Sequence, residues 1–115
     1  MRPSWVEVDL DAVTHNVRLI AAEVAPAHLC AVVKADGYGH GDVPVAEAAL
    51  AGGATSLAVA LVEEGVRLRD AGIDAPILVL AEPPVADAAT IVANRLIPTV
   101  YREEFVAALA AATDG

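Results

Sequence analysis

Residues 29–42 read LCAVVKADGYGHGD, and the architecture of the chain is predicted from this stretch outward. Its first five residues are apolar throughout, which is typical of a short buried strand. Lys34 closes this strand, and the glycines that recur over residues 37–41 predict a flexible loop. Asp42 is expected to cap a helix that runs to about Leu50 and ends at the glycine pair 52–53. The stretch therefore predicts one βα unit.

The alternation of a short apolar run with an amphipathic stretch recurs three times after this unit. The predicted strands cover residues 56–60, 77–80 and 97–100, and the predicted helices cover residues 62–71, 85–93 and 101–112. Repeated βα units place consecutive strands parallel, in a sheet that is covered on both faces. The fold class is therefore α/β. A doubly wound sheet and a (β/α)8 TIM-type barrel both agree with this pattern. A barrel typically needs about 250 residues, so this chain would supply only about its first half.

The segment before the first unit predicts a strand and a helix. Residues 6–10 alternate between apolar and acidic side chains, which indicates a half-buried strand. Asp9 or Asp11 is placed to cap the following helix, whose apolar positions recur with helical spacing up to Val24. Pro26 is expected to end this helix.

Composition and charge exclude several classes of protein. Apolar residues make up 57% of the chain, which argues against disorder, and no apolar run approaches the roughly 18 residues of a membrane span. The formal charge of −9 offers no electrostatic footprint for nucleic acid or anionic lipid. Glu7 interrupts any secretory signal, and Cys30 is the only cysteine, so a cytoplasmic protein is expected. The histidines lack zinc-binding spacing, and no metal is predicted.

The chemistry of the chain centres on Lys34, the only lysine. The C-terminal ends of strands are where α/β folds place ligands, and a partly desolvated amine there is a candidate nucleophile for a carbonyl carbon. Tyr38 adds a phenolic donor four residues later. Taken without its neighbours, such a lysine is usually a solvated strand-end residue. A dinucleotide-binding fingerprint is excluded because Asp42 stands where its third glycine would be, and no Gly-Lys-Ser/Thr sequence forms a P-loop.

Residues 32–41, VVKADGYGHG, resemble the pyridoxal-phosphate attachment motif of bacterial alanine racemases. Residues 5–16 are similar to the opening of that family, and residues 76–80 are similar to one of its later barrel strands. The resemblance implies a fold-type III enzyme with an N-terminal barrel, a C-terminal β domain and a homodimeric assembly. Residues 1–115 would then be an incomplete N-terminal portion of the barrel domain, without the C-terminal β domain.

The resemblance also implies roles for individual residues. Lys34 would hold the cofactor pyridoxal 5'-phosphate as an imine and act as one of two catalytic bases. Tyr38 would contact the cofactor phosphate, while Val32 and Leu80 would line its pocket. The substrate would be alanine, and the D-alanine produced would serve cell-wall peptidoglycan. The family takes its second base from a tyrosine in the C-terminal domain of the partner subunit, so this chain alone is expected to be inactive or nearly so.

Other readings of the sequence remain open. A related racemase of broader substrate range would share much of the motif. A non-catalytic half-barrel could self-associate through its open strand edges, as an assembly module that at most binds cofactor. A pyridoxal-phosphate carrier of the same barrel type is a weaker alternative, because the GYGHG run at 37–41 favours the racemase. Residues 63–64 and 103–104 are predicted to be solvated acidic helix faces, and Trp5 is predicted to be a packing residue.

Overall fold

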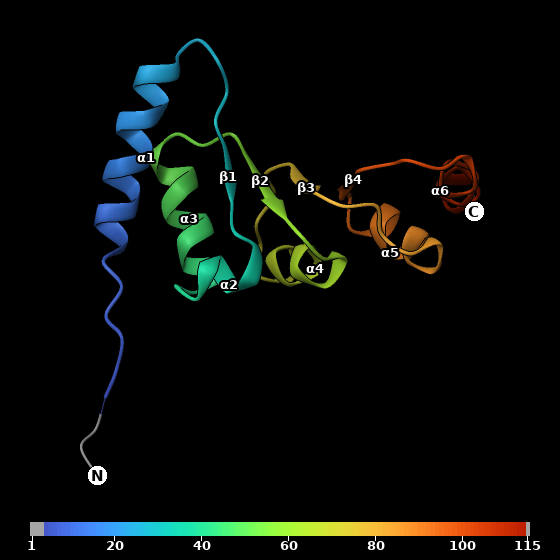
Figure 1. Cartoon of the computed structure of the whole chain (residues 1–115), viewed down its shortest axis with the longest axis horizontal. Coiled ribbons are helices and arrows are strands. Elements are labelled where there is room, and N and C mark those ends of the chain that lie inside the picture. Colours follow the sequence, from blue (N-terminus) through green and yellow to red (C-terminus); the bar gives the residue numbers. More distant parts are fainter. Residues whose placement is uncertain (1–3, 115) are drawn as a thin grey trace.

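The computed structural model describes residues 4–114. Its centre is a parallel sheet formed by β1 (Cys30–Val32), β2 (Ser56–Val59), β3 (Ile77–Val79) and β4 (Ile97–Pro98) (Figure 1). The strands lie in the order β1-β2-β3-β4, so each crossover adds the next strand on the same side of the last. A barrel keeps this order, whereas a doubly wound sheet reverses it. The α/β prediction is confirmed, and the strand order agrees with part of a barrel.

Helices connect the strands and flank the sheet. They are α1 (Leu10–Val24) before the sheet, α2 (Lys34–Tyr38) and α3 (Asp42–Gly52) between β1 and β2, α4 (Val62–Asp70) between β2 and β3, η1 (Val85–Asp87) and α5 (Ala88–Ala93) between β3 and β4, and α6 (Glu103–Asp114) after β4. α1 lies at one end of this arrangement and α6 at the other (Figure 1). Among residues 4–114, no helix is both long and apolar enough to cross a membrane.

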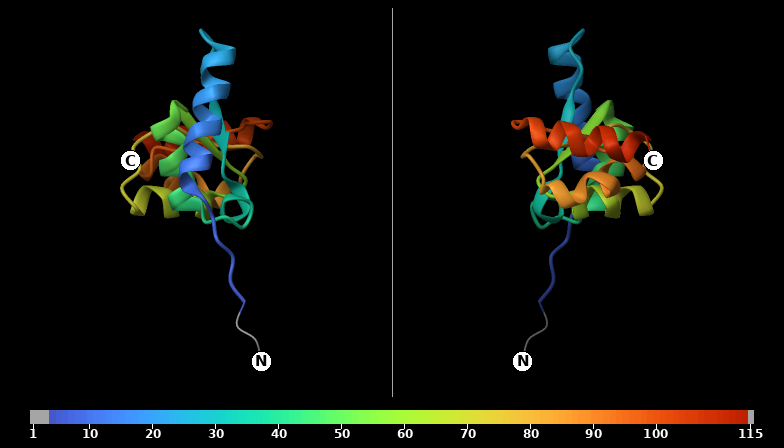
Figure 2. Two further views of the ribbon diagram at one scale, coloured as in Figure 1. Left: turned by 90° about the vertical axis from the view of Figure 1, so that its left-hand side faces the viewer. Right: turned by 90° about the vertical axis from the view of Figure 1, so that its right-hand side faces the viewer.

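Helix α1 packs on α3 and forms an outer layer beside the sheet, as the left-hand view of Figure 2 shows. The predicted cap is confirmed, because the Asp9 carboxylate accepts a hydrogen bond from the backbone N–H of Ala12 at 3.1 Å. The two helices approach closely at Gly52, where a Cβ atom would lie 2.6 Å from the carbonyl oxygen of Thr14. The Thr14 hydroxyl donates to the carbonyl of Ala48 at 2.9 Å. Glycine at position 52 is therefore what permits this contact.

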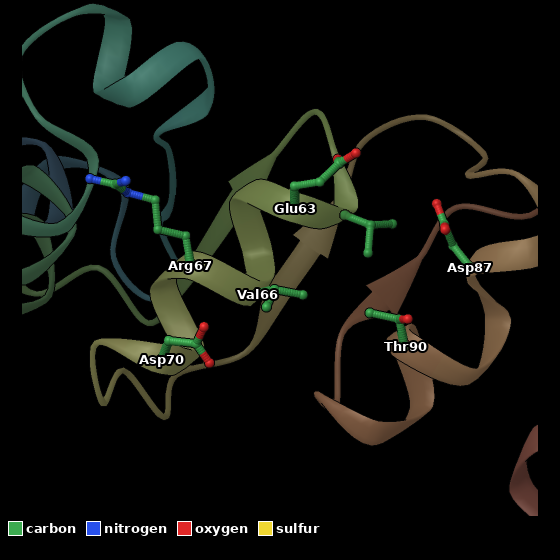
Figure 3. Close-up of a pocket in the computed structure, with 7 residues that line it drawn as sticks. Glu63, Val66, Arg67, Asp70, Asp87 and Thr90 are labelled. Carbon is green, nitrogen blue, oxygen red and sulfur yellow. The ribbon is translucent and has the colours of Figure 1, made fainter.

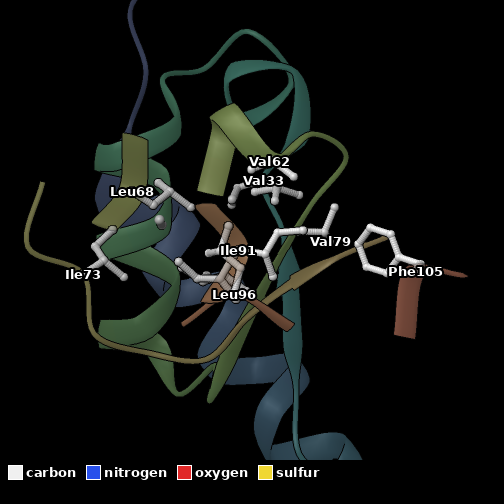
Figure 4. Close-up of a cluster of buried hydrophobic side chains, with 12 residues drawn as sticks. Val33, Val62, Leu68, Ile73, Val79, Ile91, Leu96 and Phe105 are labelled. Carbon is white, nitrogen blue, oxygen red and sulfur yellow. The ribbon is translucent and has the colours of Figure 1, made fainter. Parts of the chain in front are cut away.

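One face of the sheet carries the hydrophobic core. Its most buried side chains from the strands and from Val33, directly after β1, are 0–1% exposed and are Val33, Leu57, Val59, Ile77 and Val79. They form one cluster with side chains of the covering helices, including Leu68 of α4, Ile91 of α5 and Phe105 of α6 (Figure 4). Because successive strand residues point to opposite faces, every second strand residue enters this cluster.

The prediction of a strand over residues 6–10 is wrong. Residues 4–9 have no regular secondary structure, and α1 begins at Leu10. Val6 is 82% exposed, and Trp5, predicted to pack, is 73% exposed and donates only to the Glu7 carboxylate at 3.1 Å. A strand needs a neighbouring strand for its backbone hydrogen bonds, and within residues 4–114 no strand lies beside this segment.

The first strand is also less buried than predicted. Residues 29–33 are apolar, yet Cys30 is exposed and Val32 is 39% exposed. β1 is an edge strand of the four-stranded sheet, paired only with β2 among the described residues. Only the side of β1 that carries Ala31 faces the core, and Val33, directly after the strand, lies in that core. The apolar pattern thus identified the strand correctly but not its exposure.

Candidate functional site

Lys34 lies two residues after the end of β1, at the edge of the sheet where the parallel strands end. Val32 ends β1 and is 39% exposed, and Leu80 directly follows β3 and is 40% exposed. The register aligns Val32 with Ala58 and Ala58 with Leu78, so Val32 and Leu80 lie on the same face of the sheet. Lys34 is half-buried and makes no ion pair within residues 4–114. The structure therefore presents an unpaired amine at the end of an apolar face.

The segment after Lys34 is a hydrogen-bonded left-handed turn, which corrects the prediction of a flexible loop. Ala35, Asp36 and Tyr38 have φ values of 53°, 57° and 58°, and Gly37 between them has 64°. Such a conformation costs on the order of 1–3 kcal/mol for each residue other than glycine, so surrounding contacts must hold it. Within the turn, the N–H of Gly37 donates to the carbonyl of Val33 at 2.9 Å. The exposed Tyr38 phenol extends from this turn.

Two polar side chains of the motif stabilise the turn from within. The Nδ1 of His40 lies 3.1 Å from the carbonyl oxygen of Gly37, to which the ring N–H donates. The Asp36 carboxylate accepts a hydrogen bond from the backbone N–H of Asp42 at 2.9 Å. His40 and Asp36 therefore both stabilise the turn.

Helix α4 holds the same turn from outside through Glu64. Its carboxylate accepts hydrogen bonds from the backbone N–H groups of Ala35 at 2.6 Å, Ala60 at 2.9 Å and Leu61 at 2.8 Å. The prediction of a solvated acidic face over residues 63–64 is therefore wrong for Glu64, although Glu63 is exposed. The position of Glu64 in the first turn of the predicted helix was the available signal, because an acid there often binds backbone N–H groups.

A second contact joins α4 to the far end of the turn. The Arg67 guanidinium pairs with the Asp42 carboxylate at 2.7 Å. The Asp42 side chain is 8% exposed, whereas that of Arg67 is 68% exposed. Asp42 is the first residue of α3, its carboxylate accepts the N–H of Val43 at 2.8 Å, and the cap position is occupied by Gly41, so the prediction that Asp42 caps this helix is wrong. Because residues 64 and 67 are three apart, they lie on one face of α4.

Glu82 performs a similar task where β3 and β4 end. Its carboxylate accepts hydrogen bonds from the backbone N–H groups of Tyr101 and Arg102 and pairs with the Arg102 guanidinium. The N–H of Tyr101, aided by the contacts to Arg102, holds the pKa of Glu82 below its ordinary value of 4.5. Sequence reasoning missed Glu82, because its partners lie about twenty positions away along the chain.

Two cavities lie near these elements. A small one of about 190 Å³ lies where β2 and β3 end, beside Ala60, Leu61 and Glu82. A larger one of about 480 Å³ opens between α4 and the η1–α5 segment, lined by Glu63, Arg67, Asp70, Asp87 and Thr90 among others (Figure 3). The larger cavity is lined by helix residues and includes none of the predicted site residues. Among the residues that the structure describes, no cluster of three His, Cys, Asp or Glu side chains could hold a metal ion.

Known proteins match this chain over nearly its whole length. Residues 8–115 match the family described as alanine racemase, N-terminal domain. The chain is 46% identical over 112 residues to the alanine racemase of Desulfovibrio desulfuricans, a match that covers 96% of this chain and 30% of the relative. It is 49% identical over 109 residues to the alanine racemase of Geobacillus stearothermophilus, which covers 91% of this chain and 27% of the relative.

Solved structures agree with the sequence matches. The crystal structure of alanine racemase from Bacillus anthracis with bound L-Ala-P has a TM-score of 0.91 at 46% identity and covers 100% of this chain and 30% of that one. The alanine racemase from Streptomyces coelicolor has a TM-score of 0.83 at 38% identity, covering 92% of this chain and 30% of that one. The chain thus spans about 30% of the length of its relatives. In sequence and in fold, it belongs to the alanine racemase family, and its residues 8–115 match the N-terminal domain of that family.

Proposed function

We propose that this chain is the lysine-bearing portion of a pyridoxal-phosphate-dependent racemase that interconverts L- and D-alanine and supplies D-alanine for peptidoglycan. The observation that carries the proposal is the unpaired Lys34 amine at the end of β1, in a chain whose relatives are alanine racemases. In this proposal, residues 1–115 are part of the barrel domain. A C-terminal β domain and the second subunit of a homodimer would complete the enzyme.

The residues present suit pyridoxal phosphate. Its aldehyde requires a primary amine, which Lys34 offers without a competing carboxylate partner in the described part of the chain. Val32 and Leu80 expose apolar surface on the same face for an aromatic ring, and the exposed phenol of Tyr38 is available as a phosphate donor. When bound, the cofactor supplies an electron sink that makes the Cα–H bond of an amino acid acidic.

Lys34 would have two tasks in this proposal. Its amine would hold the cofactor on the protein through a covalent bond to the aldehyde carbon. With the substrate bound, the Lys34 amine would remove a proton from the substrate Cα or return one to it on one face. Inversion at Cα requires a second proton-transfer group on the opposite face. We assign that group to a part of the enzyme outside residues 1–115, and we expect this chain alone to be inactive.

The cofactor-binding step is testable on this chain because Lys34 is its only lysine. The purified protein would be incubated with pyridoxal phosphate, reduced with borohydride and mapped by mass spectrometry. We expect a stoichiometric adduct at Lys34 at low cofactor concentration and none there in Lys34→Arg. Labelling only at the N-terminal amine, or only at large excess of cofactor, would contradict a preorganised site.

The assignment of the second base is tested by activity. L-alanine and pyridoxal phosphate would be incubated with the 115-residue chain, and D-alanine would be measured by chiral chromatography. We expect no D-alanine above the level produced by free cofactor, with Lys34→Arg as the matched control. Rapid, Lys34-dependent production of D-alanine by the purified chain would show that both proton-transfer groups are present within it.

A self-associating half-barrel is a second candidate. It is favoured by the apolar face that carries Val32, Leu80 and Ile97, because each of these residues is 39–47% exposed. Parallel sheets are normally covered on both faces, so this surface is suited to a second apolar layer. Sedimentation velocity over a wide range of protein concentration would show a reversible increase in mass if this reading is correct. A chain that stays monomeric throughout would eliminate it.

A further inference from the structure

We propose that Glu64, on helix α4, is a positioning residue that fixes the orientation of the Lys34 turn, and that its carboxylate cannot be replaced by an amide. The consequence for cofactor attachment rests on the function proposed above. The hydrogen bonds themselves do not depend on that function. Glu64 is not among the site residues that were predicted from the sequence.

The carboxylate of Glu64 connects two neighbouring strand ends. One oxygen, Oε2, accepts the N–H of Ala35, which is the residue directly after Lys34, at 2.6 Å. The other, Oε1, accepts the N–H groups of Ala60 and Leu61, which follow β2, at 2.9 and 2.8 Å. The contact to Leu61 is the ordinary contact of an acid in the first turn of a helix. The contact to Ala35 is additional and reaches the turn that carries the lysine.

Three backbone N–H donors converge on this side chain, and within residues 4–114 it makes no hydrogen bond to an acceptor. An ionised carboxylate has two acceptor oxygens and no donor, whereas the amide of glutamine has one acceptor oxygen and an NH2 group. In Glu64→Gln, the amide oxygen satisfies two donors when it faces Ala60 and Leu61, so the NH2 group would confront the Ala35 N–H. The substitution preserves size and shape but leaves the Ala35 N–H without an acceptor.

A second contact from α4 makes the arrangement a two-point attachment. Arg67, one helical turn after Glu64, pairs with the buried carboxylate of Asp42 at 2.7 Å. The N–H of Asp42 donates to the carboxylate of Asp36 at 2.9 Å, and Asp36 is part of the turn, so the ion pair is linked to the turn. Helix α4 therefore holds the segment from Ala35 to Asp42 at both ends. A left-handed turn that contains residues other than glycine persists only where surrounding contacts hold it.

The inference is tested first without cofactor, by amide hydrogen exchange measured with NMR. Losing one hydrogen bond to a charged acceptor corresponds to a roughly tenfold or greater rise in the exchange rate of the Ala35 amide in Glu64→Gln. The amide of Leu57, which is bonded to the Pro76 carbonyl in the core, reports global stability and is expected to change little. Glu63→Gln is the matched control, since it removes the same charge from the exposed neighbour. Unchanged Ala35 exchange in Glu64→Gln would overturn the inference.

The second readout is the borohydride-trapped adduct on Lys34 as a function of pyridoxal phosphate concentration. We expect Glu64→Gln to need roughly tenfold more cofactor for half-maximal labelling, because the hydrogen bond from the Ala35 N–H is lost. Glu63→Gln should match the wild type. Equal labelling of Glu64→Gln and wild type would overturn the positioning role. Failure of the wild type itself to label at Lys34 would overturn the proposed function, while the Ala35 exchange result would still decide the contact.

Should Glu64→Gln not fold, the wild-type protein still provides a test. A scalar coupling across the hydrogen bond is expected between the Ala35 amide nitrogen and the Glu64 carboxyl carbon. Its detection would support the contact directly, and its absence in a well-resolved spectrum would overturn it.

Discussion

The two faces of the sheet differ although they are built from the same strands. On the covered face, Val33, Leu57 and Ile77 are 0–1% exposed beneath the helices. On the other face, hereafter the bare face, Val32, Leu80 and Ile97 are 39–47% exposed. Both sets are aliphatic, and neighbouring residues such as Val32 and Val33 belong to opposite sets.

The comparison separates the residues that stabilise the fold from those that form the candidate site. Full burial of an aliphatic side chain contributes about 1.5–3 kcal/mol to the stability of the fold. Side chains on the covered face contribute this full amount, whereas those on the bare face contribute only part of it. Lys34 follows the exposed Val32 by two positions, and Leu80, directly after β3, lies on the same face as Val32. The candidate cofactor site therefore lies on the face that contributes least to the stability of this chain.

The largest expected difference is between Leu57→Ala and Leu80→Ala, the same substitution on the two faces. Leu57→Ala leaves a cavity in the core and is expected to lower the free energy of unfolding by about 3 kcal/mol. Leu80→Ala removes a side chain that is already 40% exposed and should cost less than about 1 kcal/mol. Urea unfolding followed by circular dichroism measures both values. Equal losses would show that the bare face is covered in solution.

The next largest effect concerns the outer helical layer over the covered side. In Gly52→Ala, the new Cβ would lie 2.6 Å from the Thr14 carbonyl oxygen and 2.9 Å from the Val17 side chain. Overpacking of this kind typically costs about 1–3 kcal/mol. We expect a loss in that range, measured by urea unfolding, together with faster amide exchange in α1. Ala51→Ser, at the exposed preceding position, is the control and should be nearly neutral.

A smaller, pH-dependent effect is expected at Glu82, where the strand ends are held together. The folded-state pKa of Glu82 is below its ordinary value of 4.5, first because of the Tyr101 N–H and then because of Arg102. The stability that this carboxylate contributes is present above pH 4.5 and is lost as the pH falls through the lower folded-state value. Glu82→Gln should be less stable than wild type at pH 7 and should lose less stability on acidification.

Thermal unfolding at a series of pH values from 3 to 7 measures this difference. Glu103→Gln, which alters an exposed carboxylate at the start of α6, provides the control and should follow the wild-type curve. A wild-type acid profile retained in Glu82→Gln would mean that other carboxylates account for the whole dependence.

The smallest expected change in stability is for Ile97→Lys, on the bare face of the edge strand β4. Ile97 is 47% exposed, so the substitution should alter the free energy of unfolding by no more than about 0.5 kcal/mol. A charge on an apolar edge should also reduce association between chains and the binding of the dye ANS. Unfolding by urea and sedimentation velocity test the two statements separately. A large loss of stability would assign Ile97 to the core and break the distinction between the faces.

The sequence predicted most of the regular structure because hydrophobic periodicity is local. The apolar runs around Val59 and Val79 and the amphipathic stretches between them correspond to observed strands and helices. The same reasoning failed at Val6 and Val8, where an alternating pattern met no neighbouring strand in the described chain. Periodicity indicates which backbone conformation suits a segment, whereas a strand also requires a partner for its hydrogen bonds.

For the candidate site, the motif identified Lys34 and its place after a strand, and the structure agrees with that placement. The roles predicted for Tyr38, Val32 and Leu80 remain proposals. The contacts of Glu64 and Glu82 were not predicted, because a carboxylate on a helix face looks the same in the sequence whether it meets water or a distant N–H group. Their partners, Ala35 and Tyr101, become neighbours only when the parallel strands align their ends.

By itself, the sequence determined the α/β class, the order of the βα units and the position of the lysine, because these depend on residues close together in the chain. The tertiary structure decided which face of each strand is covered, since Val32 and Val33 are chemically alike and only the helices distinguish them. It also decided that residues 35–38 form a left-handed turn. An alanine, an aspartate and a tyrosine do not adopt that conformation on local preference alone, and contacts such as the Glu64 hydrogen bond to Ala35 are needed to hold it.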